Sequence, residues 1–265
     1  MRQQMFKNIK AVFFDIDGTL VSFKTHEVPQ SAKEAIHAVR QRGVKVFIAT
    51  GRPMPFINNL KDVEYDGIMS VTGACCMTAD GEIIQSQPVE KSDIERLIKE
   101  TSQRPMPVLF ASKDKAIGCM IDADRKSVEE VMTLLSLEVP EEQPMTKALD
   151  MEVLQVIAFF TAEEEPRMMD EVLMGCDAAR WHPAFADCIR KRTNKATGID
   201  TICRYYGIDL QDTMAVGDGG NDITMLRHAG VGVAMGNASD EVKAHADYIT
   251  DDVDNDGVAK LLQKL

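Results

Sequence analysis

The feature that most constrains this chain is a short apolar run that stops at a pair of aspartates. Residues 11–14 read Ala-Val-Phe-Phe, and the sequence D-I-D-G-T (residues 15–19) follows without a break. A second apolar run covers Val44 to Ala49. Runs that are apolar throughout suit strands buried on both faces, which is typical of parallel sheets. Because ligands bind at the carboxyl ends of parallel strands, the two aspartates lie where chemistry is expected.

The segment between these two runs is predicted to be a helix. Ser31 and Glu34 have the spacing of a capping box, in which the two side chains bond each other's main-chain N–H groups. Ile36 and Val39 recur at helical spacing, and Gly43 follows as a terminator. Strand-helix alternation returns after residue 196. The two ends of the chain are therefore predicted to build one parallel α/β sheet from β-α-β units.

The middle of the chain has a different pattern. It combines predicted hairpins with helices, including one helix over residues 163–174 and one strand over residues 180–189. Such a mixture between two stretches of α/β alternation indicates an inserted module. We therefore predict an α/β fold with a Rossmann-like, parallel-sheet core made of residues 1–82 and 189–265. An α+β domain is predicted to be inserted at residues 83–188.

Two further polar segments follow predicted strands. The sequence G-D-G-G-N-D (residues 217–222) comes after one strand, and T-G (residues 50–51) comes after another. Two ionised carboxylates in one loop, such as Asp15 and Asp17, are costly without a cation, and a few carboxylates plus water suit Mg²⁺. Asp218 can complete such a site. Asn221 and the main chain of residues 50–51 suit an anion such as phosphate.

Each of these loops alone is also compatible with a solvated turn, because Asp, Asn and Gly are turn residues. Together, D-I-D-G-T, T-G-R, a lysine and G-D-G-G-N-D-I-T-M-L resemble the motifs of the haloacid dehalogenase-like (HAD) phosphatases, and more narrowly the Cof-type branch. In that branch a large α+β cap lies between the second and third motifs. Here Arg52 and Lys195 are 143 residues apart, which leaves room for such a cap.

The resemblance implies a role for each residue of these motifs. Asp15 would be the nucleophile that forms an aspartyl-phosphate, and Asp17 would protonate the leaving alcohol and then deprotonate the attacking water. Mg²⁺ is the implied cofactor, and its implied ligands are the Asp15 carboxylate, the Asp17 backbone carbonyl and Asp218. The residues implied to bind the phosphoryl oxygens of the substrate are Ile16, Thr50, Gly51, Lys195 and Asn221.

The lysine is the part of the pattern that departs most from the family. The family's lysine usually lies in a K-G-x-x-K-G-like stretch, whereas Ala196 stands here where glycine is common. Lys195 is the best match because it directly precedes a predicted helix, and Lys191 is the alternative. Asp222 would then orient the lysine or a metal-bound water.

The acidic composition limits the partners of the protein. The chain has 42 acidic and 30 basic residues, for a net charge of −12. Nucleic acids and anionic membranes are bound by clustered Lys and Arg, so neither is expected as a partner. The N-terminal region lacks the apolar run of a signal peptide, and the six cysteines form no C-x-x-C pair. We therefore expect reduced thiols and a cytoplasmic location.

The sequence thus predicts a Mg²⁺-dependent phosphatase of small phosphorylated metabolites, with sugar phosphates as the class implied by resemblance. A phosphomutase on the same core and a non-catalytic protein that binds a phosphorylated ligand are the alternatives. The intact pair Asp15 and Asp17 argues against the non-catalytic alternative. Because four carboxylates are predicted to converge (Asp15, Asp17, Asp218 and Asp222), activity should depend strictly on the metal. The sequence carries no signal for an oligomeric state.

Overall fold

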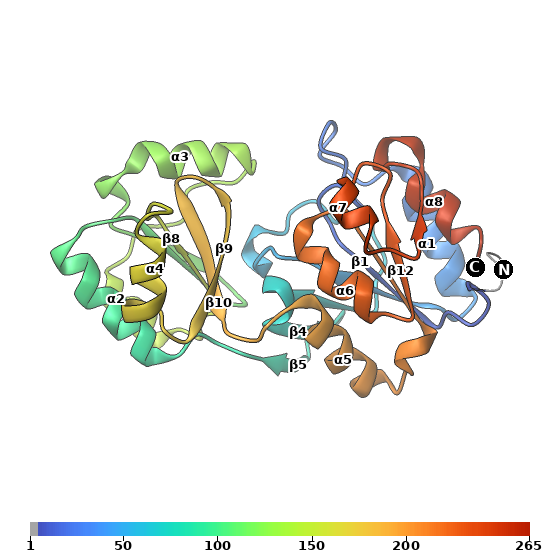
Figure 1. Ribbon diagram of the computed structural model, residues 1–265, viewed down its shortest axis with the longest axis horizontal. Coiled ribbons are helices and arrows are strands. Elements are labelled where there is room, and N and C mark those ends of the chain that lie inside the picture. The colour runs from blue at the N-terminus through green and yellow to red at the C-terminus, as the bar shows by residue number, and fades with distance from the viewer. Residues whose placement is uncertain (1–4) are drawn as a thin grey trace. The chain divides into compact units, whose positions relative to one another are not determined.

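The fold was analysed in a computed structural model that describes residues 5–265 (Figure 1). The chain divides into two compact units. The first comprises the residues up to 52 together with residues 57–85 and 194–265. The second comprises residues 53–56 and 86–193. The short segment Pro53–Phe56 groups with the second unit because Phe56 packs into a core cluster of that unit.

The first unit is built on an eight-stranded sheet in the order β13-β12-β11-β1-β2-β3-β4-β5. Neighbouring strands from β13 to β3 are parallel, as the apolar runs predict. In contrast, β4 is antiparallel to β3, because the two are joined by a short turn at Val71–Gly73 that cannot make a crossover. The strands are β1 (Ala11–Phe14), β2 (Lys45–Ala49), β3 (Gly67–Ser70), β4 (Cys75–Thr78), β5 (Ile83–Ser86), β11 (Thr213–Gly217), β12 (Val231–Ala234) and β13 (Tyr248–Ile249).

Helices pack against this sheet. None of the helices in residues 5–265 is long and apolar enough to cross a membrane. Helices α1 and α8 pack against each other, and α5 packs against α6 (Figure 1). One core cluster joins the buried sheet residues Phe13 and Phe47 to Ile199 and Ile202 of α5. The helices are α1 (Gln30–Gln41), α5 (Lys195–Tyr206), α6 (Ile223–His228), α7 (Asp240–Lys243) and α8 (Gly257–Leu262).

The capping box predicted for α1 is wrong. The helix begins at Gln30, directly after Pro29, and no side chain caps its first turn. Ser31 lies inside that turn, where its hydroxyl donates to Asp256 Oδ1 at 2.6 Å. The Ser31 hydroxyl is thus used for a contact with the distant C-terminal segment and not as a helix cap.

The second unit is an antiparallel sheet with helices on both faces, an α+β arrangement. The strand order is β7-β6-β8-β10-β9, and all the pairings are antiparallel. One core cluster contains Ile94 and Leu97 of α2, and a cluster on the other face contains Val128 of α3. The elements are α2 (Lys91–Gln103), β6 (Val108–Ala111), β7 (Ala116–Cys119), α3 (Arg125–Leu134), β8 (Gln155–Ala158), α4 (Glu165–Arg167), β9 (Cys176–His182) and β10 (Phe185–Arg190).

Two predicted elements of this unit differ in the structure. The helix expected over residues 163–174 is a short α-helix, α4, followed by a π-helical turn over Met168–Val172. The wider turn allows Met168, Val172 and Leu173 to be buried together. The strand expected over residues 180–189 is part of the hairpin of β9 and β10. That hairpin turns at Pro183, which cannot donate to a strand ladder.

Candidate active site

Three polar loops of the first unit meet at one edge of the parallel sheet. Phe14 of β1 pairs with Ile48 of β2 on one side and with Val216 of β11 on the other. Because these strands run in the same direction, the loops that follow them lie side by side. The loop after β1 carries Asp15 and the loop after β11 carries Asp218. The sequence motifs are therefore brought together by strand register.

Lys195 lies at the centre of this edge. It is the first residue of α5, where Asn194 and Thr197 form a capping box that fixes the start of the helix. The Lys195 side chain has no solvent exposure, and its Nζ lies 2.6 Å from Asp15 Oδ1 and 2.5 Å from Asp222 Oδ1. A fully buried lysine is rare unless it is paired, so these two ion pairs define its position.

Asp222 organises the loop that carries Asp218. Its Oδ1 binds Lys195, while its Oδ2 accepts hydrogen bonds from the main-chain N–H groups of Asp218 at 3.0 Å and Gly219 at 2.9 Å. Asp222 is completely buried. Both of its oxygens are therefore engaged within the protein, and it holds Asp218 and Lys195 in fixed positions.

Asp218 is held by two residues from other segments. Thr19 Oγ1 donates to Asp218 Oδ1 at 2.8 Å, and Asn237 Nδ2 donates to Asp218 Oδ2 at 3.2 Å. The same Asn237 amide donates to the carbonyl of Gly18 at 2.8 Å. Gly18 has a φ of +82°, and a Cβ added there would overlap the Asp218 carboxylate. Only glycine allows the two loops to approach this closely.

The electrostatics of this cluster leave it short of positive charge. Carboxylate oxygens of Asp15, Asp218 and Asp222 lie within 4.8 Å of one another. Burial, and then the charge of Asp222, raise the pKa of Asp15 well above its usual value, although Lys195 opposes this. Burial also raises the pKa of Asp218 to about 6. Burial lowers the pKa of Lys195, but the two carboxylates beside it outweigh burial and leave that pKa above its usual value.

This donor set fits a hard divalent cation. Oxygen ligands on closely spaced carboxylates are what Mg²⁺ prefers. A charge of +2 would offset both the burial and the neighbouring carboxylate charges that raise the pKa values of Asp15 and Asp218. Asp222 belongs to the same cluster, but it is completely buried, with Oδ1 bound by Lys195 and Oδ2 accepting two main-chain hydrogen bonds. Asp218 is partly exposed, and each of its oxygens accepts only one hydrogen bond. Asp15 and Asp218 are therefore the side chains of this cluster best placed to hold the cation.

Asp17 is bound by Arg52 and lies outside this cluster. Its carboxylate accepts two hydrogen bonds from Arg52, with Nε 2.7 Å from Oδ2 and Nη2 2.8 Å from Oδ1. Its side chain is 33% exposed, whereas Asp15 is almost completely buried. The Asp17 carboxylate is not part of the group formed by Asp15, Asp218 and Asp222. The two aspartates of the D-I-D-G-T loop therefore have different surroundings.

The residues implied to bind phosphate lie around the same edge. Thr50 is buried, and its Oγ1 accepts a hydrogen bond from the main-chain N–H of Arg52 at 3.0 Å. A Cβ added at Gly51 would lie 3.4 Å from Asn221 Nδ2, so these two loops face each other. Asn221 is exposed. The Ile16 side chain is completely buried, which leaves only its main chain to contact a ligand.

Sequence reasoning missed three residues of this edge, namely Thr19, Arg52 and Asn237. Thr19 and Arg52 lie inside motifs that carried the family resemblance, whereas Asn237 lies in the segment after β12. Their contacts depend on side chains from distant segments, for example the 219 residues between Gly18 and Asn237. The polar character of these side chains was the only sign in the sequence that they make specific contacts. The partner of each side chain is fixed only by the fold. Lys191, the alternative lysine, is exposed and lies in the second unit.

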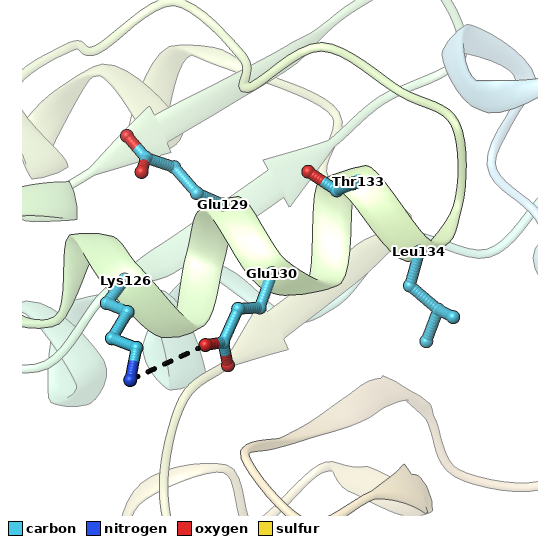
Figure 2. A pocket seen from close by; sticks show the side chains of 5 residues that line it. All are labelled: Lys126, Glu129, Glu130, Thr133 and Leu134. Carbon is cyan, nitrogen blue, oxygen red and sulfur yellow. Dashed lines mark ion pairs between the residues drawn. The ribbon is translucent and has the colours of Figure 1, made fainter.

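A hollow of about 460 Å³ on the surface of α3 does not have the properties of a functional site. Figure 2 shows that Glu129 and Thr133 point to one side of the helix, whereas Lys126, Glu130 and Leu134 point to the other. Lys126 and Glu130 pair with each other at 3.6 Å, one helical turn apart. The lining side chains come from one helix and do not converge, so the polar edge of the first unit remains the candidate site.

Comparisons with known proteins show which family the chain belongs to. The sequence profile of the haloacid dehalogenase-like hydrolases matches residues 12–262. The Bacillus subtilis (strain 168) protein named "Putative phosphatase YkrA" is 32% identical over 258 residues, which cover 97% of each chain. The 5-amino-6-(5-phospho-D-ribitylamino)uracil phosphatase YcsE of the same strain is 28% identical, with 97% of this chain and 95% of YcsE covered.

A solved structure extends the similarity to the fold. The HAD subclass IIB sugar phosphatase BT4131 is 40% identical, with a TM-score of 0.83 and with 96% of this chain and 98% of that chain covered. The chain therefore belongs to the haloacid dehalogenase-like hydrolases, and it has their fold with a cap domain. It is a phosphatase, an enzyme that hydrolyses phosphoric monoesters.

Proposed function

We propose that this phosphatase hydrolyses phosphate monoesters of small metabolites with Mg²⁺ and through a covalent intermediate on Asp15. The observation that carries the proposal is the buried Asp15 carboxylate, held by Lys195 at 2.6 Å within a cluster of carboxylates at a strand edge. A structural ion pair would need only one carboxylate for the lysine. Three carboxylates around one lysine are expected instead in a site that receives a cation and a phosphoryl group.

In the first step, an oxygen of Asp15 attacks phosphorus. Lys195 binds Oδ1, so Oδ2 is the oxygen assigned to the attack. The bond from Asp15 to phosphorus forms, the bond from phosphorus to the ester oxygen breaks, and Asp17 gives a proton to the departing oxygen. In the second step water attacks phosphorus, Asp17 takes its proton, and the bond to Asp15 breaks. When bound by Asp15, Asp218 and the Asp17 carbonyl, Mg²⁺ supplies positive charge to the phosphoryl group.

The other site residues position the phosphoryl group. Thr50, Gly51 and Asn221 lie on loops that face each other, and each offers a hydrogen-bond donor. The main chain of Ile16 is proposed as a further donor. Asp222 keeps the Lys195 ammonium beside Asp15, so that the charge is already in place when the substrate arrives. Phosphoryl transfer depends mainly on such positioning and charge neutralisation.

We propose a sugar phosphate as the substrate class, supported by the similarity to the sugar phosphatase BT4131. The domain inserted at residues 83–188 is proposed to act as the cap and to exclude water from the reaction. A cytoplasmic location is also proposed. It is supported by the six cysteines, all of which are buried and free of disulfides. The strong negative charge supports the proposal that nucleic acids and membranes are not partners.

The experiment that tests this function is a phosphate-release assay with sugar phosphates and p-nitrophenyl phosphate, with and without Mg²⁺. We expect release only with the metal, and a loss of roughly a thousand-fold or more in Asp15→Asn, since no nucleophile remains. Asp254→Asn is the matched control, because Asp254 is a carboxylate of the same unit that lies outside the cluster and pairs with the exposed Lys24. Turnover by Asp15→Asn close to that of the control would refute the covalent mechanism.

A further inference from the structure

Arg52 makes a two-point contact with Asp17. The guanidinium Nε and Nη2 lie 2.7 and 2.8 Å from the two carboxylate oxygens. The Arg52 side chain is 18% exposed and that of Asp17 is 33% exposed, so the pair is largely sheltered by the protein. A planar fork that holds both oxygens fixes the orientation of a carboxylate as well as its position.

The main chain of Arg52 is itself held at the strand edge. Its N–H donates to Thr50 Oγ1 at 3.0 Å, and its carbonyl accepts from the N–H of Val71 at 3.1 Å. Thr50 in turn accepts at its carbonyl from the N–H of Thr72 at 2.8 Å. The guanidinium therefore extends from a backbone segment that is tied to its neighbours. The place of the Asp17 carboxylate is thereby set by the loop after β2.

The contact also separates Asp17 from the other site carboxylates. Asp15, Asp218 and Asp222 form a cluster within 4.8 Å, and the Asp17 carboxylate lies outside it. A fourth carboxylate free to rotate would be attracted by any cation held by that cluster. Arg52 offers Asp17 a competing partner in a fixed direction, which keeps the Asp17 carboxylate outside that cluster.

We propose that Arg52 is the positioning residue of Asp17, which holds the Asp17 carboxylate where it can exchange a proton with the departing oxygen and keeps it off the metal cluster. The inference rests on the proposed function, in which Asp17 is the acid and base. The alternative is a purely structural ion pair, and the structure contains a suitable comparison. Arg40 makes a similar fork to Asp66, with 3.1 and 3.3 Å contacts, away from the site.

The test compares phenyl phosphate, whose leaving oxygen needs a proton, with p-nitrophenyl phosphate, whose leaving oxygen does not. For Arg52→Ala we expect kcat/KM to fall roughly ten-fold more with phenyl phosphate than with p-nitrophenyl phosphate, as for Asp17→Asn. Arg52→Lys keeps the charge but not the fork, so its loss should be intermediate. The double variant should be no worse than Asp17→Asn alone, since Arg52 acts through Asp17.

The control is Arg40→Ala, which should lower the stability of the protein without changing the ratio of kcat/KM for the two substrates. Equal losses on both substrates in Arg52→Ala, or losses that multiply in the double variant, would overturn the positioning role. If Asp17→Asn shows the leaving-group dependence and Arg52→Ala does not, only this inference fails. If the wild-type protein with Mg²⁺ hydrolyses neither ester, the proposed function fails and the inference fails with it.

Discussion

Lys195 Nζ lies 2.6 Å from Asp15 Oδ1, although 180 residues separate them in the chain. The contact joins the loop after β1 to the start of α5, which follows the second unit in the chain. Both side chains are buried, and Asp222 completes the arrangement from a third segment. The ion pairs of the candidate active site are therefore also long-range contacts of the first unit. Changes to them should affect stability as well as activity.

Replacement of Lys195 by methionine should destabilise the protein. It leaves Asp15 and Asp222 buried and close together without a cation, and breaking a buried pair in this way costs about 3–5 kcal/mol. Urea denaturation followed by circular dichroism at pH 7 measures the change in the free energy of unfolding. Lys10→Met is the control, because Lys10 pairs with Asp212 at 2.6 Å but is 62% exposed.

For the exposed Lys10–Asp212 pair we expect a much smaller loss, since water can replace the partner. A loss in Lys195→Met as small as that of the control would show that the buried carboxylates do not depend on the lysine.

Addition of Mg²⁺ should raise the melting temperature of the wild-type protein. A ligand that binds only the folded state at one hundred times its Kd adds about 2.7 kcal/mol of stability. The shift should be lost in Asp218→Asn, because an amide replaces one of the carboxylates of the cluster. Asp254→Asn should keep the shift, since it removes an acidic group of the same unit at another place. Equal shifts in the two variants would place the metal outside the cluster.

The sequence was sufficient to predict the residues whose position follows from strand register. Asp15 and Asp218 each follow a buried parallel strand, so their meeting at one edge requires only the strand order. Lys195 was placed by its position at the start of a helix. The role of Arg52 could not be predicted, because its fork to Asp17 depends on side-chain directions in two loops. Local motifs fix positions along the chain, whereas such pairs are fixed by the packing of loops.

The predictions of the Ser31 cap and of the helix over residues 163–174 failed because tertiary contacts decide these positions. Ser31 has the spacing of a helix cap, but in the fold it bonds to Asp256, which lies 225 residues away. The helix expected over residues 163–174 contains a π-helical turn because burial of Leu173 with Met168 takes precedence over α-helical spacing. In both cases a tertiary contact overrides a local preference, and a single sequence does not report that contact.

The second unit contains a carboxylate whose protonation should be measurable directly. Burial raises the pKa of Asp187 to about 6, although hydrogen bonds from Trp181 and Gln155 oppose this. Trp181 Nε1 donates to Asp187 Oδ2 at 2.8 Å, and Trp181 is the only tryptophan of the chain. The fluorescence of this tryptophan should therefore change with a midpoint near pH 6, and Asp187→Asn should abolish the transition.

The raised pKa of Asp187 also determines how the stability of the protein changes with pH. The folded state binds the Asp187 proton more tightly than the unfolded state, whose carboxyl has a pKa near 3.8. Its contribution is therefore neutral below about pH 4 and becomes unfavourable as pH rises to about 6. Asp187→Asn removes the cost of burying the charge, so it should stabilise the protein at pH 7 by on the order of 2 kcal/mol and by much less at pH 4. Denaturation at both pH values measures the difference.

Asp150→Asn is the control for this pair of measurements, because Asp150 is a 72% exposed carboxylate of the same unit. It should leave both the fluorescence midpoint and the pH dependence of stability unchanged. A midpoint near pH 6 that persists in Asp187→Asn would contradict the raised pKa of the carboxyl. Loss of the transition in Asp187→Asn, but not in Asp150→Asn, requires that the Asp187 carboxylate be the group that titrates.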